Sequence, residues 1–236
     1  MINIKNITKK YDNVKVLDDF NLSIEENKII CLLGPSGCGK TTLLNILSGL
    51  TKYESGNIYG LDNKSFSYIF QEPRLLPTST VEDNIIFVLK KNYDKKTSKK
   101  IADKYVDLVK LKGYKNFYPN QLSGGMKQRV SIARAFAYES QILLMDEPFK
   151  GLDIELKRNL MDIFLSLWNE NNKTVIFVTH DIDEAILISD TIFVLDGPPI
   201  KIKNTFDLKS DKRNRRLDDD EIASRKKGVE SSIREG

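Results

Sequence analysis

The sequence predicts an α/β fold in which the main sheet is mostly parallel. Three short runs are continuously apolar, as is typical of strands buried on both faces of a sheet: Ile29–Leu33, Ile142–Met145 and Val175–Val178. Each run ends in a glycine or a polar group, and helical patterns separate the runs. Strands that alternate with helices form parallel sheets, in which ligands bind at the carboxyl edge. We therefore expect the functional groups to gather at that edge.

The first 30 residues predict a separate antiparallel part. Apolar and polar side chains alternate here, and turn-forming residues interrupt the pattern at Asp12-Asn13 and at 26–28. Such alternation is typical of half-buried strands that are joined by turns. We expect short antiparallel strands that form an N-terminal antiparallel β subdomain.

Two amphipathic helices are expected between the buried strands. Apolar residues recur at helical spacing from Thr41 to Leu50, where Gly49 is a natural stop. A second apolar stripe runs from Leu156 to Trp168 and ends near 171–172. Each helix follows a predicted strand, as the alternating pattern requires.

The stretch of about 72–140 breaks this alternation. It contains no strand-like run, and helical patterns cover 101–111 and 127–138. We interpret it as a helical subdomain inserted into one α/β domain of residues 1–208. Residues 209–236 are charged and poor in apolar side chains, which predicts a charged C-terminal helix or a frayed tail without chemistry of its own.

The composition excludes several classes of protein. With 236 residues, 40% of them hydrophobic, the chain can form one sizeable core. A net charge of only +4 does not suggest a nucleic-acid partner.

Cys31 and Cys38 give neither a disulfide framework nor a metal-ligand spacing, so we expect a reducing compartment. No window approaches the roughly 20 apolar residues of a membrane span, and no signal-peptide pattern is present. Any membrane connection is expected to come through a partner.

The segment from Gly34 to Thr41 fits the phosphate-binding motif G-x-x-x-x-G-K-[ST], between a predicted strand and a predicted helix. Glycines let backbone N–H groups form an anion nest, and the helix presents its positive end. Lys40 can contact the β- and γ-phosphates, and the Thr41 hydroxyl can ligate Mg²⁺. The alternative, a glycine-rich turn that happens to precede a helix, is disfavoured by the match over the whole motif. The predicted nucleotide-binding residues are Gly34, Pro35, Ser36, Gly37, Cys38, Gly39, Lys40, Thr41 and Thr42.

Asp146 and Glu147 end the second apolar run. In phosphate-loop enzymes, an aspartate at this place holds Mg²⁺ or its water. A second carboxylate that is not bound to metal can take a proton from the attacking water, which contributes about 10²- to 10⁴-fold. A solvent-exposed acidic pair at a strand end is the alternative. The phosphate loop favours the catalytic interpretation.

Further motifs accompany these two in a fixed order. They are Leu-Ser-Gly-Gly-Met at 122–126, Gln71 after Tyr68-Ile69-Phe70, Gly-Leu-Asp at 151–153, and His180 after the third apolar run. Over residues 11 to about 196, the chain resembles the ATPase subunits of ATP-binding-cassette (ABC) proteins. This resemblance implies a P-loop NTPase core that binds ATP with Mg²⁺ and hydrolyses it.

The resemblance also implies roles for single residues. Gln71 is implied as a ligand of Mg²⁺ and a catalytic residue, and Asp153 as a residue at the nucleotide. His180 is implied to contact the γ-phosphate and to orient the attacking water, although a lone histidine is more often structural or solvated. Tyr11 is implied to stack on adenine; the alternative is surface packing at the end of an edge strand.

The signature segment implies a dimer. Ser123 can cap the following helix, while Gly124 and Gly125 permit close approach of the backbone to phosphate. In the family, this helix end faces the γ-phosphate held by the other copy, so two chains enclose two ATP molecules head to tail in a homodimer. Met126 departs from the glutamine usual in the family, and the short segment from Gly56 to Gln71 predicts a trimmed hairpin.

A finer resemblance indicates transport. The segments QEPRLLP, TVEDN, LSGGMKQR, PFKGLD and VTHDIDEAI together are similar to importer subunits for nitrate, sulfonates and taurine. This implies integral membrane permease subunits as partners, a solute-binding protein as an indirect partner, and a cytoplasmic location on the inner face of the cell membrane. Leu75, Leu76 and Pro77 are then part of the groove that receives the permease; the alternative is that they merely join two subdomains.

Two other functions are consistent with a phosphate loop of this family. One is a non-transport ABC ATPase of the cell-division or repair type, although the long coiled-coil insertions or paired cassettes of repair proteins are not present in the sequence. The other is a regulatory nucleotide-binding module without turnover, against which Glu147 argues. The sequence does not indicate the transported solute.

Overall fold

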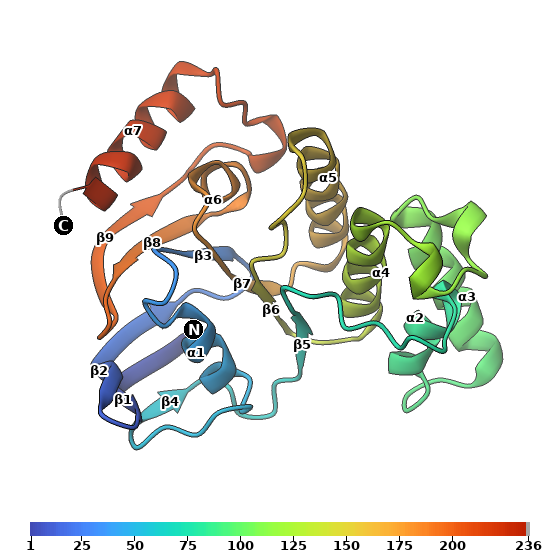
Figure 1. Cartoon of the computed structure of the whole chain (residues 1–236), viewed down its shortest axis with the longest axis horizontal. Helices are drawn as coiled ribbons and strands as arrows, with labels where there is room; N and C mark the ends of the chain where they lie inside the picture. The colour runs from blue at the N-terminus through green and yellow to red at the C-terminus, as the bar shows by residue number, and fades with distance from the viewer. Residues whose placement is uncertain (235–236) are drawn as a thin grey trace.

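A computed structural model describes residues 1–234, which form two β-sheets flanked by helices (Figure 1). The main sheet has six strands in the order β5-β6-β7-β3-β8-β9. β9 pairs antiparallel with β8, while the other neighbours are parallel, so the predicted, mainly parallel α/β fold is confirmed. The strands are β3 Ile29–Leu33, β5 Phe66–Ile69, β6 Ile142–Asp146, β7 Thr174–Thr179, β8 Thr191–Asp196 and β9 Lys201–Asp207.

The three apolar runs form adjacent strands in the middle of this sheet. Every residue of β3, β6 and β7 is buried, as expected for strands with both faces covered. Leu33 pairs with Thr179 across β3 and β7, and Asp146 pairs with Val178 across β6 and β7. The carboxyl ends of these strands therefore lie side by side, where the sequence predicts the functional groups.

The N-terminal segment forms a three-stranded antiparallel sheet in the order β2-β1-β4. Its strands are β1 Ile2–Tyr11, β2 Val14–Ile24 and β4 Ser55–Tyr59. The antiparallel pairing is as predicted, but β1 and β2 are two long strands rather than several short ones. Shifts of register within the pair let each strand continue through polar positions where the alternation breaks. Residues 60–65 connect β4 to β5 through turns, in line with the short segment noted in the sequence.

Helices cover the main sheet at the places that the apolar stripes predict. The helices next to the sheet are α1 Lys40–Leu47, α5 Ile154–Asn171 and α6 Ile182–Ile188. α1 ends before Gly49, whose φ of +75° is not helical, and α5 ends at Asn172 with a φ of +48°. The strands β8 and β9 and the helix α6 were not identified from the sequence.

A group of three helices lies between β5 and β6 in the chain and forms one end of the molecule (Figure 1). They are α2 Val81–Leu89, α3 Lys95–Leu108 and α4 Gly124–Ala137. The sequence analysis missed α2 and placed the start of α3 too late, at residue 101. α3 begins at Lys95 because Asp94 caps it and accepts a hydrogen bond from the N–H of Thr97 at 2.8 Å. These helices lie within the stretch of about 72–140 for which the sequence predicts a helical subdomain.

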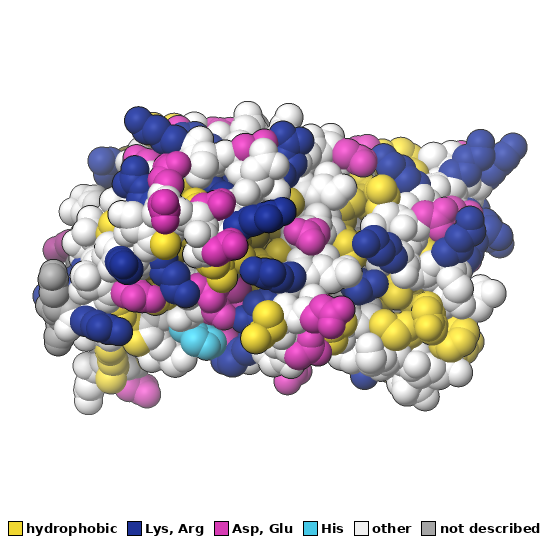
Figure 2. All heavy atoms as spheres, turned by 90° about the horizontal axis from the view of Figure 1, so that it is seen from above, with side chains coloured by type: hydrophobic (Ala, Val, Ile, Leu, Met, Phe, Trp, Pro, Cys, Tyr) yellow, Lys and Arg dark blue, Asp and Glu magenta, His cyan; other side chains and the backbone are white. Residues whose placement is uncertain are grey.

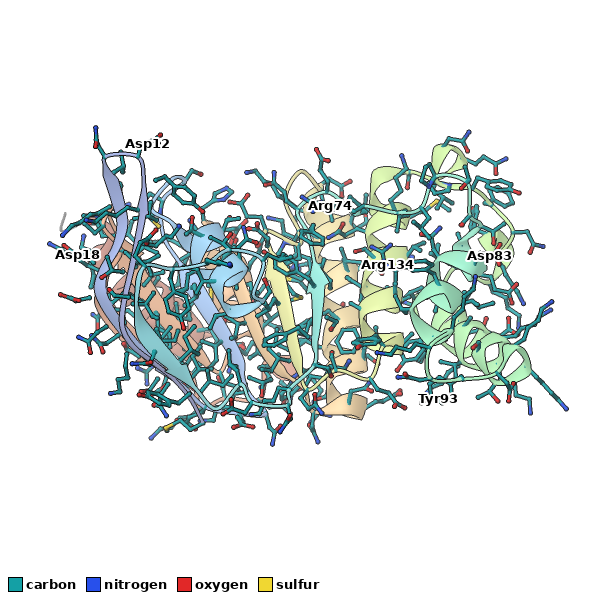
Figure 3. All side chains as sticks on the ribbon, turned by 90° about the horizontal axis from the view of Figure 1, so that it is seen from below. Asp12, Asp18, Arg74, Asp83, Tyr93 and Arg134 are labelled. Atoms are coloured by element: carbon teal, nitrogen blue, oxygen red, sulfur yellow. The ribbon has the colours of Figure 1, made fainter. Side chains whose placement is uncertain are left out.

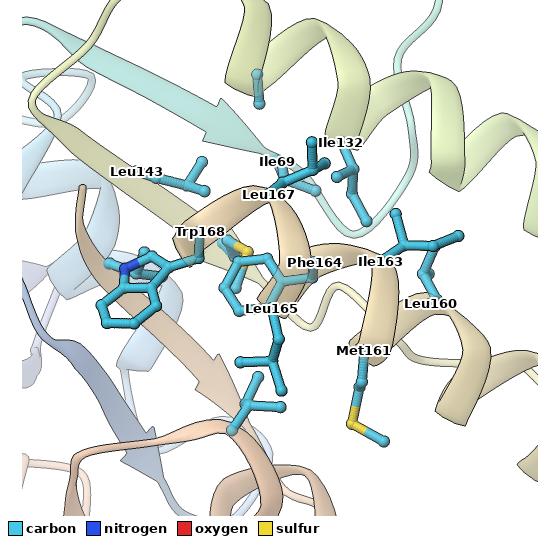
Figure 4. Packing of buried hydrophobic residues seen from close by; sticks show 14 of the residues in the cluster. Ile69, Ile132, Leu143, Leu160, Met161, Ile163, Phe164, Leu165, Leu167 and Trp168 are labelled. Atoms are coloured by element: carbon cyan, nitrogen blue, oxygen red, sulfur yellow. The ribbon is translucent and has the colours of Figure 1, made fainter. Parts of the chain in front are cut away.

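The long helix α5 is anchored in the larger of two apolar clusters. Figure 4 shows Phe164, Leu167 and Trp168 of this helix packed towards Leu143 and Ile69 of the sheet. Each such side chain contributes about 1.5–3 kcal/mol on burial. Trp168 also donates a hydrogen bond from Nε1 to the carbonyl oxygen of Lys173 at 2.7 Å. These contacts fix the C-terminal half of α5 in the core.

The charged C-terminal segment includes a helix, α7 Asp220–Arg234, preceded by a 3₁₀ turn at Lys212–Asn214. One face of this helix is buried through Ile222 and Val229, so it is not a fully solvated helix. The Arg215 guanidinium is also buried and donates to the carbonyl oxygens of Ile186 and Ser189 at 2.8 and 2.6 Å. The segment is therefore tied to the core at its start. Residues 235 and 236 of the predicted tail lie outside the described residues.

Across residues 1–234, none of the helices combines the length and the apolar character needed to cross a lipid bilayer.

Candidate active site

Four neighbouring strands of the main sheet end at one edge, and each leads into a predicted site residue. β6 ends at Asp146 and is followed by Glu147, β7 is followed by His180, and β3 leads into the loop that begins at Gly34. Ile69 at the end of β5 pairs with Met145, so Gln71 follows at the same edge. The parallel register therefore brings together groups that are far apart in the sequence.

The phosphate loop is packed so closely that two of its glycines cannot carry a side chain. A Cβ atom on Gly34 would lie 2.7 Å from the carbonyl oxygen of Leu195. Gly39 has a φ of +111°, and a Cβ atom there would meet Cγ1 of Val16, on β2, at 2.5 Å. These contacts hold the loop between β8 and the N-terminal sheet.

The loop also presents backbone donors. The N–H groups of Gly37, Gly39 and Thr41 make no backbone hydrogen bond within the described residues. α1 begins at Lys40 with no side-chain cap, so the positive end of the helix dipole is not neutralised by the chain. An anion bound in the loop would satisfy these donors, and a phosphate group fits the arrangement.

Lys40 is held at the mouth of the loop. Its side chain is buried, and Nζ donates hydrogen bonds to the carbonyl oxygens of Gly34 and Pro35 at 2.8 and 2.7 Å. The Cys38 side chain beside it is buried too, and this burial raises the pKa of the thiol. The loop therefore carries one cation and a neutral thiol.

Thr41 and Asp146 form the candidate metal site. The Thr41 hydroxyl donates a hydrogen bond to Oδ1 of Asp146 at 3.0 Å, which links the start of α1 to the end of β6. Asp146 is 8% exposed, and burial raises the pKa of its carboxyl group. A buried carboxylate beside a hydroxyl is a pair of hard oxygen donors, which suits Mg²⁺. The residues present thus fit this ion.

Glu147 lies between two partners at the edge of the sheet. Its Oε1 is 3.3 Å from Nδ1 of His180, and its Oε2 is 2.5 Å from Nζ of Lys150. Partial burial acts to raise the pKa of Glu147, but the interactions with Lys150 and His180 outweigh it and the pKa is lowered. The residue has a φ of +43°, a conformation that costs of order 1–3 kcal/mol and is often found at functional sites. Glu147 is therefore a carboxylate that the site keeps ionised.

His180 is exposed, in contrast to the buried strand residues before it. Figure 2 shows the histidine, coloured cyan, at the surface with acidic and basic side chains close by. Acidic and basic groups are intermixed over this face of the molecule. The imidazole is thus accessible to a ligand at the sheet edge while it contacts Glu147.

The signature residues lie apart from the loop within one chain. Ser123 caps α4 and accepts a hydrogen bond from the N–H of Met126 at 3.3 Å. Gly125 is buried in the first turn, where a Cβ atom would meet Leu156 of α5 at 3.7 Å. Asp153 caps α5 and accepts from the N–H of Leu156 at 2.9 Å. The hydrogen bonds of Ser123 and Asp153 stay within their own helices.

The two remaining predicted residues are exposed. Gln71 is solvent-accessible at the end of β5. Tyr11 is 46% exposed at the end of β1, and Nζ of Lys9 lies 4.9 Å from the centre of its ring. The hairpin that carries Tyr11 also carries Val16, which contacts the phosphate loop at Gly39. Tyr11 therefore belongs to the sheet that borders the loop.

Sequence reasoning missed the residues that hold the segment after Gln71. Arg134 of α4 donates to the carbonyl oxygens of Pro73 and Arg74 at 3.0 Å each. Figure 3 labels Arg134 on its helix and Arg74 on the connecting segment. Asn84 is fully buried and exchanges hydrogen bonds with the backbone of Leu76. A buried asparagine on a helix is the one signal that the sequence could have offered, since Asn84 stands among apolar residues of α2.

Comparison with known proteins identifies relatives over most of the chain. A family model described as ABC transporter matches residues 17–150. An ABC transporter ATP-binding protein of Methanocaldococcus jannaschii is 42% identical over 214 residues, which cover 86% of this chain and 80% of the relative. The aliphatic sulfonates import ATP-binding protein of Bacillus subtilis strain 168 is 42% identical over 194 residues, or 79% of this chain and 75% of the relative.

Solved structures share the same fold. A dimeric ATP-binding cassette in a post-hydrolysis state with ADP and Pi is 31% identical and superposes with a TM-score of 0.77, covering 89% of this chain and all of that one. A putative metal-chelate type transporter in an inward-facing conformation has a TM-score of 0.75 at 24% identity, over 90% of this chain and 84% of that one. At that identity, the second likeness concerns the fold alone.

Proposed function

The chain belongs to the ABC transporter family, and from this premise we propose that it is the ATP-hydrolysing subunit of an ABC importer. The observation that carries the proposal is the sheet edge at which the phosphate loop, the Thr41–Asp146 pair and the Glu147–His180 pair meet. Import is the function printed for the Bacillus subtilis relative. A site with all three parts is suited to turnover, not only to binding.

The phosphate loop binds the ATP phosphates. Free N–H groups of the loop and the positive end of α1 attract the oxygens, and Lys40 exchanges its bonds to Gly34 and Pro35 for contacts with the β- and γ-phosphates. Tyr11, on the neighbouring hairpin, stacks on the adenine ring. A cassette of the same fold with ADP and Pi bound supports nucleotide binding by this chain.

Glu147 acts as the general base. Its lowered pKa keeps the carboxylate ionised, so it can accept a proton from water that attacks the γ-phosphorus. His180, 3.3 Å from that carboxylate, contacts the γ-phosphate and orients the water. Thr41 and Asp146, together with Gln71, would hold Mg²⁺, which would neutralise charge on the phosphate oxygens.

A second copy of the chain completes the site. Within one chain, Ser123 and Gly125 lie at the end of α4, with the Ser123 hydroxyl bonded to its own helix. We propose that they meet the γ-phosphate on the loop of the partner, so that two copies enclose two ATP molecules head to tail, with Asp153 near the same interface. Dimeric cassette structures at 31% identity support this arrangement.

Closure of the dimer drives transport in this proposal. ATP is contacted from both sides only in the closed state, so its binding shifts the equilibrium towards closure, and hydrolysis with phosphate release lets the two copies separate. An integral membrane permease senses the change through the segment after Gln71, which Arg134 holds on α4. The chain then works at the inner face of the cell membrane, with a solute-binding protein as an indirect partner.

A comparison of phosphate release tests the proposal. Wild-type protein and the Glu147→Gln variant are assayed with ATP and Mg²⁺, with Glu170→Gln, an exposed acid at the C-terminal end of α5, as the control. We expect Glu147→Gln to release phosphate at least about 100-fold more slowly, because the amide cannot accept the proton. Equal rates for wild type and Glu147→Gln would falsify the catalytic assignment.

A further inference from the structure

Lys157, which lies outside the sequence motifs, forms ion pairs with the segment that follows His180. Lys157 lies in the first turns of α5, and its Nζ is 2.5 Å from Oδ2 of Asp181 and 2.8 Å from Oε1 of Glu184. Asp181 directly follows the histidine, and Glu184 lies in the first turn of α6. One ammonium group thus joins α5 to both ends of the turn after His180.

The backbone on either side of His180 is also held. Thr179 is 1% exposed and donates its hydroxyl hydrogen to Oε2 of Glu184 at 2.6 Å. The same hydroxyl oxygen accepts a hydrogen bond from the N–H of Asp181 at 3.0 Å. Asp181 in turn caps α6, with its Oδ1 accepting from the N–H groups of Asp183 and Glu184 at 2.9 and 3.1 Å. His180 sits in the middle of this closed network, although its own ring is exposed.

The network connects to the interface of the proposed dimer. The N–H of Lys157 donates to the carbonyl oxygen of Asp153 at 2.9 Å, so the two residues stand one helical turn apart. Ile154, the first residue of α5, is 81% exposed, which leaves this end of the helix accessible to another chain. From Leu160 onward, α5 is packed into the apolar core (Figure 4). A displacement of the Asp153 segment therefore reaches Lys157 through the first helical turn of α5, which stands on this buried part of the helix.

We propose that Lys157 is a positioning residue for His180, which couples the Asp153 segment to the placement of the histidine beside Glu147. Lys157 touches neither Glu147 nor the phosphate loop, so it acts through Asp181 and Glu184. The proposal rests on the proposed ATPase function for its kinetic consequence, but the placement of the ring is independent of turnover. The cationic head, and not only the bulk of the side chain, is what the two carboxylates require.

A purely structural role is the competing explanation. Glu184 is 2% exposed, and removal of Lys157 leaves its carboxylate buried without a counter-ion. Removal of one partner of a buried ion pair lowers the free energy of unfolding whether or not the pair positions a functional residue. The variant Lys157→Met/Glu184→Gln removes this penalty, because it has no unpaired charge at residue 184 and the amide oxygen can still accept from Thr179.

The single histidine of the chain supplies a direct probe. We would record the imidazole ¹H–¹³C signals of the full-length protein without nucleotide, at one pH, for wild type, Lys157→Met, Lys157→Arg and the double variant. Lys104→Met is the matched control. Lys104, on α3, forms a surface ion pair at 3.2 Å with Glu170, which lies on α5 like Lys157. ATPase kinetics and thermal unfolding are measured on the same samples.

The expected result has two parts. The His180 signal shifts or broadens in Lys157→Met and in the double variant, while Lys157→Arg and Lys104→Met keep the wild-type signal. In the two affected variants kcat falls by about 10- to 100-fold, with KM for ATP changed less than about twofold, because the misplaced group acts after binding. Arginine restores kcat, since it provides the same charge to both carboxylates.

The opposite results overturn the proposal. An unchanged His180 signal in the double variant, or wild-type kcat in that variant, shows that Lys157 serves stability alone. Equal losses in Lys157→Met and Lys104→Met would also contradict it. Failure of the ATPase function is recognised separately, by a Glu147→Gln variant that turns over at the wild-type rate while the His180 signals still respond to Lys157.

Discussion

The Thr41 hydroxyl lies 3.0 Å from Oδ1 of Asp146, so residues 105 positions apart in the sequence form one pair of oxygen donors. Asp146 is buried, and burial raises the pKa of its carboxyl group. Burial therefore makes the ionised form of Asp146 less favourable, and a bound cation would offset this unfavourable free energy. This relationship leads to the first prediction.

Asp146→Asn is expected to abolish turnover without loss of the fold. Phosphate release should fall by at least about 100-fold, because the carboxylate that binds the metal is gone. The unfolding free energy without nucleotide should stay within about 1 kcal/mol of wild type or rise, since a buried charge is replaced by a neutral amide. Denaturant titration and phosphate release check both parts. Asp162→Asn, an exposed acid on α5, is the control, and a large loss of stability in Asp146→Asn alone would contradict the account.

Mixing two inactive variants should restore activity if each site is built from two chains. Lys40→Ala disables the phosphate loop, and Ser123→Arg disables the signature helix end. Each should be inactive by itself, whereas an equal mixture should reach about a quarter of the wild-type rate, since half of the dimers contain one intact site. A mixture that stays as inactive as its components would argue for a site within a single chain.

Gly39→Ala is expected to destabilise the protein and remove ATP binding. At a φ of +111°, with Cγ1 of Val16 only 2.5 Å from the new Cβ atom, the loop or the hairpin must move. We expect a loss of about 1–3 kcal/mol in unfolding free energy. Gly113→Ala, which has open space around it, should lose little. Nucleotide-binding titrations and denaturation curves measure the two effects; equal stability of both variants would contradict the packing argument.

Tyr11→Ala is expected to weaken ATP binding without a change in the chemical step. A stacked base contributes about 1–3 kcal/mol, so KM for ATP should rise roughly 5- to 150-fold while kcat stays close to wild type. Tyr59→Ala provides the control, because Tyr59 is 54% exposed on β4 of the same sheet. If both variants keep the wild-type KM, Tyr11 serves surface packing, the alternative interpretation of its position.

Because of Lys173, the free energy of unfolding should depend on pH in the alkaline range. Burial lowers the pKa of this amine to about 8, although Nζ donates to the carbonyl oxygen of Tyr138 at 2.6 Å. The unfolded chain, with a pKa near 10.4, therefore binds more protons between pH 8 and 10, so the unfolding free energy contributed by this group rises with pH there. The rise should be of the order of 1–3 kcal/mol. Urea titrations at pH 7.5 and 10 check it, and Lys173→Met should lack it.

Much of the fold follows from local patterns. β3, β6 and β7 are five or six residues long and buried throughout, so they appear in the sequence as uninterrupted apolar runs. β9 has no such pattern in the sequence, because its buried and exposed positions do not alternate cleanly. Its strand conformation depends instead on pairing with β8. The helix α2 is short, and its polar Asn84 interrupts the apolar pattern because it bonds to the preceding loop.

The candidate site was predictable to the extent that its residues lie in contiguous motifs. The loop from Gly34 to Thr41 is such a motif, and its flanking strand and helix are local as well. Lys157 could not be found in this way, because its partners are Asp181 and Glu184, on a different element. Contacts of this kind depend on how α5 is placed against the sheet, and no spacing in the sequence encodes that placement.

The helical insertion leaves the sheet after β5 and returns at β6, and these two strands are immediate neighbours. Because the two strands are parallel, the chain leaves at the carboxyl end of β5, after Ile69, and returns at the amino end of β6, before Ile142. The two connections therefore lie at opposite edges of the sheet, so a rotation of α2, α3 and α4 as one body would have to follow an axis along this pair of strands. Such a rotation would carry Ser123, at the start of α4, towards or away from the neighbouring chain, while the strand pairing that assembles the phosphate site stays intact.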